Sequence, residues 1–309
     1  MFQKIYSIFS SNRFNSRILQ FLIILALLFI ILHVYNNHYS SKLEGFSQSE
    51  NYILKEDKQI YDDFYTQIYD DLMLPQTSSQ YTISKIIKMT EPSKQYSVFL
   101  DVGSGTGHTV NTLRKKGFQA HGIDQSKAMI GFSQTKFPDI SVKCGNVENP
   151  IAYDRGTFTI ILCTEKTIYE FENKSTFFQN CYFWLQQNGY LILHLVERNQ
   201  FNTIIPAGKP SMLDDPQKYS ENRITDTLID FINFQYKSTY DFSKTDKVIH
   251  KETFTDTKTN VVRENEKTLY IEPIETILLL ANKYGFIAKG KVNIYNKDGE
   301  YLYILERMM

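Results

Sequence analysis

The sequence predicts an α/β fold in which a mainly parallel sheet lies between two layers of helices, a three-layer αβα sandwich. Three observations support this prediction. Strand-like and helix-like segments alternate between residues 97 and 195. The strand-like segments, such as SVFLDV (97–102) and FTIILC (158–163), are apolar on both faces, as buried parallel strands are. Polar or glycine residues follow these strands, at the edge where such sheets bind their ligands.

Two helices are expected before the alternating region. In residues 51–74, Ile60, Phe64, Ile68 and Leu72 recur every four residues, and Pro75 follows, so this segment is predicted to be a helix that ends there. A second amphipathic segment, SSQYTISKIIKM (78–89), predicts another helix that leads into the first strand of the sheet.

The alternating region then predicts five strands and three helices. The strands are expected at 97–102, 118–124, 140–145, 158–163 and 190–195. The helices are expected at 108–117, 126–137 and 175–189; Ser126 is the predicted N-cap of the second, and Gly117 and Gly189 are the predicted ends of the first and third.

The segment 196–270 is predicted to be an antiparallel β insertion on the substrate side of the sheet. After an irregular beginning, residues 225–242, 247–256 and 260–271 show strand-like alternation. We expect this insertion to form a lid over the ends of the parallel strands. The segment 280–307 then predicts a last helix and a closing β-hairpin.

The N-terminal region contains an apolar run from Phe21 to Leu32. We expect a single-pass transmembrane anchor at 18–35, between a tail (1–17) and a tether (36–50), with the folded domain at 51–309. A cleaved signal peptide and a buried helix remain alternatives. The predicted localisation is the membrane. The side of the membrane on which the folded domain lies stays open, because the basic residues before the span and the free cysteines indicate opposite sides.

Composition excludes several classes of function. The 34 basic and 34 acidic residues cancel, so nucleic acid is not favoured as a partner. The three cysteines, Cys144, Cys163 and Cys181, form no C-x-x-C pair, so neither a zinc site nor a disulfide framework is expected. No metal is predicted. A lipid bilayer is an expected partner through the N-terminal helix.

The stretch LDVGSGTGH (100–108) is the most informative motif. A dinucleotide-binding turn has the spacing G-x-G-x-x-G, whereas Gly103, Gly105 and Gly107 alternate, and no Gly-Lys-Ser/Thr of a phosphate loop follows. A carboxylate at Asp101 would repel a pyrophosphate but attract an ammonium group. Asp124 ends the next strand, where a carboxylate can accept hydrogen bonds from ribose hydroxyls. The two predict a nucleoside joined to an amino acid.

These motifs resemble those of the class I S-adenosylmethionine-dependent methyltransferases. VFLDVGSGTG resembles their first motif and HGIDQSKAMI their second, and CGNVEN, FTIILCTEKTIYEF and WLQQNGYLILHL resemble the following strand segments in the same order. The resemblance covers residues 61–195, and the C-terminal hairpin is typical of the same Rossmann-like fold. It implies S-adenosyl-L-methionine as cofactor.

The family's site residues are carried over by position. The resemblance implies that the methionine part is held by Asp101, Gly103, Ser104 and Gly105, the ribose by Asp124 beside Gln125, the adenine by Asn146 and Val147, and the pocket floor by Cys163 and Thr164. An aromatic residue of the upstream helix, Tyr65 or Tyr69, is expected over the sulfonium. Thr159 and His108 depart from the residues usual at their positions.

The expected function is methyl transfer by a membrane-anchored methyltransferase with a small molecule or a protein as acceptor. Glu165, Tyr169, His194 and Glu197 are candidate general bases, and none is assigned a catalytic role. A non-catalytic S-adenosylmethionine-binding protein is one alternative. An NAD-dependent oxidoreductase is another, and it would need a parallel sixth strand in place of the hairpin.

Overall fold

The computed structural model describes residues 20–31, 51–210, 215–294 and 299–308. The chain divides into two compact units, residues 1–47 and 48–309. The described part of the first unit is a helix at 20–31, and the rest of the predicted anchor at 18–35 lies outside the described residues. Among the described helices, none combines the length and the apolar character needed to cross a bilayer.

The large sheet of the second unit has seven strands in the order β11-β12-β6-β5-β2-β3-β4. The pairs from β6 to β4 are parallel. Strand β12 is antiparallel to both β6 and β11, so a hairpin stands where an NAD-dependent oxidoreductase would need a parallel strand. The strands are β2 (Val98–Val102), β3 (Gln119–Asp124), β4 (Ser141–Cys144), β5 (Phe158–Cys163), β6 (Leu185–Val196), β11 (Phe286–Asn293) and β12 (Glu300–Arg307).

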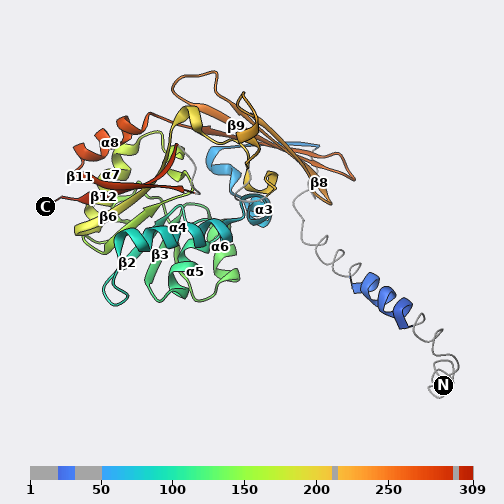
Figure 1. The fold of residues 1–309 in the computed structure, drawn as a ribbon, viewed down its shortest axis with the longest axis horizontal. Coiled ribbons are helices and arrows are strands. Elements are labelled where there is room, and N and C mark those ends of the chain that lie inside the picture. Colours follow the sequence, from blue (N-terminus) through green and yellow to red (C-terminus); the bar gives the residue numbers. More distant parts are fainter. Residues whose placement is uncertain (1–19, 32–50, 211–214, 295–298, 309) are drawn as a thin grey trace, which may run out of the picture. The chain divides into compact units, whose positions relative to one another are not determined.

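Helices cover both faces of the large sheet (Figure 1). One layer contains α4 (Pro75–Thr90), α5 (His108–Lys115) and α6 (Lys127–Lys136), and the other contains α7 (Lys174–Trp184) and α8 (Ile274–Lys283). Each layer has its own apolar core: Ile83, Val110 and Leu113 belong to one, and Trp184 and Ile277 to the other. The predicted αβα sandwich is therefore present. Strand order reverses next to β2, which places the switch point of the sheet at the ends of β2 and β5.

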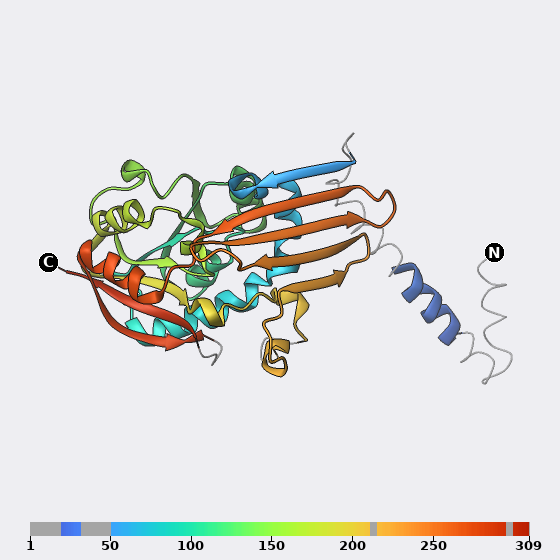
Figure 2. The ribbon, with the colours of Figure 1, turned by 90° about the horizontal axis from the view of Figure 1, so that it is seen from above.

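A second sheet of five strands has the order β1-β10-β9-β8-β7 (Figure 2). Its strands are β1 (Tyr52–Glu56), β7 (Asp226–Asp230), β8 (Phe234–Asp241), β9 (Val248–Asp256) and β10 (Val262–Leu269). The four strands of the insertion pair antiparallel, as predicted for residues 196–270. Helix α3 (Asp63–Met73) packs against this sheet through edge-to-face contacts of Phe64 and Tyr65 with Phe254.

Short 3₁₀ helices connect these elements. They are η2 (Asp57–Ile60), η3 (Pro150–Ala152), η4 (Thr167–Glu170), η5 (Arg198–Gln200), η6 (Pro206–Gly208) and η7 (Pro216–Tyr219). Two of them, η2 and η4, carry residues that reach the functional site described below.

Two of the sequence predictions are wrong at their boundaries. Residues 52–56 are not the first turns of a helix but a strand, β1, which pairs in parallel with β10 and buries Ile53. The helix predicted to end at Gly189 ends at Trp184, because Leu185 already pairs with Phe158 of β5. The predicted N-cap is correct: the Ser126 hydroxyl accepts a hydrogen bond from the Met129 amide at 3.0 Å.

Candidate functional site

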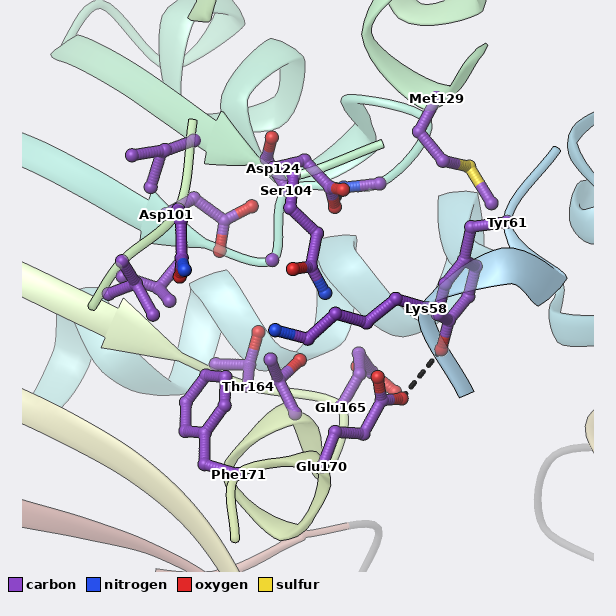
Figure 3. A pocket seen from close by; sticks show the side chains of 18 of the residues that line it. Lys58, Tyr61, Asp101, Ser104, Asp124, Met129, Thr164, Glu165, Glu170 and Phe171 are labelled. Atoms are coloured by element: carbon purple, nitrogen blue, oxygen red, sulfur yellow. Dashed lines mark hydrogen bonds between the residues drawn. The ribbon is translucent and has the colours of Figure 1, made fainter. Parts of the chain in front are cut away.

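A cavity of about 430 Å³ lies at the carboxyl ends of the parallel strands. Its volume is within the range of small-molecule sites. Its walls come from the turn after β2, the ends of β3 and β5, η2, η4 and the end of β10 in the second sheet. Figure 3 shows Asp101 and Asp124 on one side of this cavity and Glu165, Glu170 and Phe171 on the other. The cavity therefore has two facing sides, and both carry carboxylates.

The glycine turn after β2 forms the first side. The amides of Gly103 and Ser104 donate to the carbonyl of Ile123, at 2.9 and 3.1 Å, which ties the turn to the end of β3. Gly103 and Gly105 have φ values of +69° and +50°, in the left-handed region. A Cβ at Gly103 would lie 2.6 Å from Thr167, whereas one at Gly105 would meet no protein atom within 4 Å. Gly105 therefore leaves open space beside the turn.

Asp124 joins this turn to the next helix. One of its carboxylate oxygens accepts from the Gly105 amide and the other from the Ser126 amide, both at 2.9 Å. Burial raises the pKa of Asp124, and these two hydrogen bonds act in the opposite direction. Each oxygen keeps a second lone pair, so the carboxylate holds the loop and can still accept hydrogen bonds from a ligand.

Asp101 is the most strongly perturbed carboxylate of this side. It ends β2, lines the cavity and is 3% exposed. Burial raises the pKa of Asp101 well above its usual range, and the nearby carboxylates of Asp124 and Glu165 add to the shift. A ligand cation beside Asp101 would therefore favour its ionised form.

Most of the predicted site residues line the cavity. Asp101, Gly103, Ser104, Gly105, Asp124, Gln125, Asn146, Val147 and Thr164 all do so. Cys163 does not: it is fully buried in the core under the sheet, and burial raises the pKa of its thiol. Tyr65 does not line it either, because its hydroxyl donates to Glu252 of the second sheet at 2.9 Å. Tyr69, the other candidate of that helix, and Tyr61 line the cavity instead.

The residues expected at the adenine lie in one turn after β4. The Asn146 side chain accepts from the Glu148 amide at 3.0 Å, which fixes the turn in the manner of an Asx motif. Val147 is buried, and its carbonyl accepts from the Asn180 side chain of α7 at 2.8 Å. The Asn146 side chain thus shapes the turn, and contact with an adenine through neighbouring backbone remains an expectation.

The second side of the cavity holds a cluster that joins three segments. The Tyr61 hydroxyl donates to Glu170 Oε1 at 2.6 Å, and Lys267 Nζ donates to the same oxygen at 3.0 Å and also to the Tyr61 hydroxyl. Burial alone would lower the pKa of Lys267, but Glu170 and Glu252 outweigh it and the pKa is raised. We call Tyr61, Glu170 and Lys267 the Glu170 cluster.

Asp70 links helix α3 by hydrogen bonds to the glycine turn and the start of α5 on the first side of the cavity. Its carboxylate accepts from the Thr106 hydroxyl at 2.6 Å, lies 2.9 Å from His108 Nε2 and pairs with Lys136. His108, unusual for its position, thus has a structural partner. Thr159 has one as well, since its hydroxyl bonds the amide and carbonyl of Val98 and joins β5 to β2.

Of the four candidate general bases, Glu165 alone is among the residues that line the cavity. Glu165 and Lys166 are consecutive non-glycine residues with left-handed φ values of +50° and +68°. Such strain is concentrated at functional sites. Tyr169 instead bonds the backbone of Val196 through its hydroxyl, at 2.8 Å from the amide and 3.2 Å from the carbonyl. His194 is buried 3.7 Å from Glu300, away from the cavity.

Sequence reasoning missed the Glu170 cluster. Glu170 follows the fourth predicted strand by seven residues, a distance at which a polar residue at a strand end could have been suspected. No local sequence pattern links Tyr61 and Lys267, because they are 206 residues apart. They come together only because Tyr61 follows η2 and Lys267 lies on β10, two elements that are adjacent in the fold.

Comparison with known proteins identifies the fold. Residues 100–193 match the family model described as a methyltransferase domain. Over 72 residues, the chain is 39% identical to YqeM of Bacillus subtilis (strain 168), which is named as a methyltransferase; the match covers 23% of this chain and 28% of YqeM. The chain thus matches little more than a quarter of that relative's length.

Solved structures match over most of the second unit. An S-adenosylmethionine-dependent methyltransferase from Clostridium acetobutylicum ATCC 824 superposes with a TM-score of 0.61 at 18% identity, over 79% of this chain and 98% of its own. The CcbJ methyltransferase from Streptomyces caelestis gives 0.59 at 13% identity, over 81% and 98%. CalS10, an amino pentose methyltransferase from Micromonospora echinaspora with S-adenosylmethionine bound, gives 0.54 at 16% identity, over 74% and 90%.

The described residues fit S-adenosylmethionine. The Ser104 hydroxyl lines the cavity and is buried with no hydrogen-bond partner among the described residues, and the space beside Gly105 is open. Asp101 and Asp124 supply carboxylates for an ammonium group and for hydroxyls. With the match of residues 100–193 to the methyltransferase-domain model and the strand order, these features show a methyltransferase domain with the class I, S-adenosylmethionine-dependent fold.

Proposed function

We propose that this protein transfers a methyl group from S-adenosylmethionine to a small-molecule acceptor. The observation that carries the proposal is the two-sided cavity: the glycine turn with Asp101 and Asp124 on one side, and the Glu170 cluster on the other. The second sheet contributes Lys267 to its wall, which limits the space for a large partner. The amino pentose named for CalS10 is a small molecule too, which agrees with this choice.

Each side of the cavity has a distinct task in this proposal. Asp101 binds the ammonium group of the cofactor, and Asp124 accepts hydrogen bonds from its ribose. When bound, the cofactor supplies a methyl group on a positively charged sulfur, which is already activated for transfer. The remaining task of the protein is to orient the acceptor and exclude water, and Tyr61, Tyr69 and Lys267, which line the cavity, would serve that purpose.

The test is equilibrium binding of S-adenosylmethionine, S-adenosylhomocysteine and NAD to the purified chain by calorimetry. We expect the first two to bind and NAD not to bind. Gly105→Ala should weaken binding at least about tenfold, because its Cβ would occupy the open space of the cavity. Gly156→Ala is the matched control, since Gly156 also has a left-handed φ, +65°, a Cβ there would meet no protein atom closer than 3.9 Å, and it is not among the residues that line the cavity. Equal affinity of the two variants would contradict the proposed site.

We further propose that residues 18–35 anchor the protein to a membrane. The proposal is supported by the apolar run from Phe21 to Leu32 and by the fact that every described strand belongs to the unit 48–309. The full chain should sediment with phospholipid vesicles. A chain without residues 1–45 should stay in the supernatant and keep its affinity for S-adenosylmethionine. Sedimentation of both chains, or of neither, would refute the anchor.

A further inference from the structure

We propose that the acceptor is an amine that is cationic at neutral pH, and that Glu170 recognises its ammonium group. This inference rests on the proposed function, because it concerns the acceptor side of the same cavity. It is drawn from the charges, the hydrogen bonds and the aromatic side chains of that side.

The charge of the wall is strongly acidic. Among the described residues that line the cavity, the carboxylates are Asp57, Asp101, Asp124, Glu148, Glu165, Glu170 and Glu172, and the lysines are Lys58 and Lys267. Lys267 pairs with Glu170 and Lys58 with Glu148, at 3.0 and 3.9 Å. Glu165 and Glu172 form none of the ion pairs between described residues. A cleft lined by one sign of charge concentrates ligands of the opposite sign.

Glu170 is positioned to use this charge for recognition. Both hydrogen bonds that it accepts, from Tyr61 and from Lys267, go to Oε1. No described residue donates to Oε2, so one oxygen of an oriented carboxylate is available at the cavity wall. Lys267 and Tyr61 are positioning residues here: they fix the plane of the carboxylate, and the open oxygen can accept from an ammonium N–H.

Aromatic side chains complete the acceptor side. Tyr69, Phe171 and Tyr270 line the cavity together with the Glu170 cluster. Carboxylates combined with aromatic faces favour organic ammonium groups, including methylated ones, through ion pairing and cation–π attraction. Lys267 already lies over the ring of Tyr61, 4.6 Å from its centroid, so an ammonium group is compatible with this environment.

The same features disfavour other acceptors. A carboxylate or phosphate would meet Glu165 and Glu172, while the two lysines of the described wall, Lys267 and Lys58, are already paired with Glu170 and Glu148. A neutral alcohol would gain a hydrogen bond but no charge attraction. The predicted order of affinity is therefore amine above alcohol above carboxylate.

The experiment uses the purified full chain saturated with S-adenosylhomocysteine, so that no methyl transfer occurs during the titration. Two pairs of probes differ mainly in the ammonium group: glucosamine with glucose, and 4-aminocyclohexanol with 1,4-cyclohexanediol. An anionic probe is 4-hydroxycyclohexanecarboxylate. In at least one pair, calorimetry should give an amine affinity at least about tenfold above that of the alcohol. Equal affinities, tighter binding of the anion, or no amine binding would overturn the inference.

Three variants assign the effect to Glu170. Glu170→Gln keeps the shape of the side chain and should remove most of the preference for the amine. Glu165→Gln, at an exposed position, should reduce it by a smaller factor without risk to the fold. Glu275→Gln, on the exposed face of α8, is the control and should change nothing.

S-adenosylhomocysteine affinity, measured for every variant, separates this inference from the proposed function. If the unmodified chain does not bind S-adenosylhomocysteine, the proposed function itself is contradicted. If Glu170→Gln binds S-adenosylhomocysteine normally and still prefers the amine over the alcohol, only the role of Glu170 is overturned.

Discussion

Replacement of Asp101 by asparagine should make the protein more stable and a poorer binder of its cofactor. The Asp101 side chain ends β2 and is 3% exposed, and burial, Asp124 and Glu165 all raise its pKa. At neutral pH its ionised form therefore costs folding free energy. Asparagine has nearly the same shape, removes the charge and leaves the glycine turn unchanged.

The sign of the pH dependence follows from linkage. Because the folded pKa of Asp101 lies above the unfolded value of about 3.9, the folded chain binds this proton more tightly, and stability falls as pH rises between the two values. Asp101→Asn removes that loss. We expect a gain of about 0.5–2 kcal/mol at pH 7, which is the range for substitutions of this kind. This gain corresponds to a Tm higher by about 1–8 °C, and it should vanish near pH 4.

The cost appears in cofactor binding. A charge-assisted hydrogen bond contributes about 1.5–3 kcal/mol, so the variant should bind S-adenosylmethionine about 10–150-fold more weakly. Thermal melts at pH 7.5 and pH 4.5, together with calorimetry of cofactor binding, measure both effects. Asp139→Asn, at an exposed position, is the control. A lower Tm at pH 7.5, or cofactor affinity within about threefold of the unmodified protein, would refute the reasoning.

Three further predictions concern stability. Gly103→Ala should lower the free energy of unfolding by about 2–4 kcal/mol, because its Cβ would lie 2.6 Å from Thr167 and its φ of +69° is unfavourable for alanine; an unchanged denaturant midpoint would contradict this. Lys174→Met should cost about 2–3 kcal/mol, less than for a fully buried pair, because its partner Glu272 is 32% exposed; a melt at the unmodified Tm would refute the buried ion pair. Burial lowers the pKa of His250 to about 4, so between pH 6.5 and 4 the unmodified chain should lose about 3 kcal/mol more stability than His250→Gln. Parallel acid-unfolding curves of the two chains would show that His250 is not responsible.

Local sequence signals were enough to predict the first side of the cavity, to which the proposed function assigns the cofactor and which we call the cofactor side. The turn from Gly103 to Gly105 and the carboxylates of Asp101 and Asp124 lie within 24 residues of one another, and each follows directly from a strand end. Parallel strands bring their carboxyl ends to the same edge of a sheet, so the order of elements alone places these residues together. Cys163 was misassigned because successive residues of a strand point to opposite faces, and this one points into the core.

Contacts between distant segments could not be predicted. Residues 52–56 continue a helix-like pattern, and they form β1 because they pair with residues 262–266, more than two hundred positions away. Pairing of this kind outweighs local propensity, which is a weak preference. The sequence could not separate Tyr65 from Tyr69, because both lie on α3, and the choice is decided by Glu252 of the second sheet, which accepts a hydrogen bond from the Tyr65 hydroxyl.

The two sides of the cavity therefore depend on different parts of the chain. The cofactor side is built from the turn after β2 and the end of β3, and hydrogen bonds from Gly103, Ser104 and Gly105 to β3 hold it together without help from the second sheet. The acceptor side is complete only when β10 brings Lys267 to Glu170. Changes in β10 can thus alter the acceptor that fits while the cofactor contacts remain. Under the proposed function, we therefore expect the second sheet and η4 to determine which acceptor fits, and the large sheet to bind the cofactor.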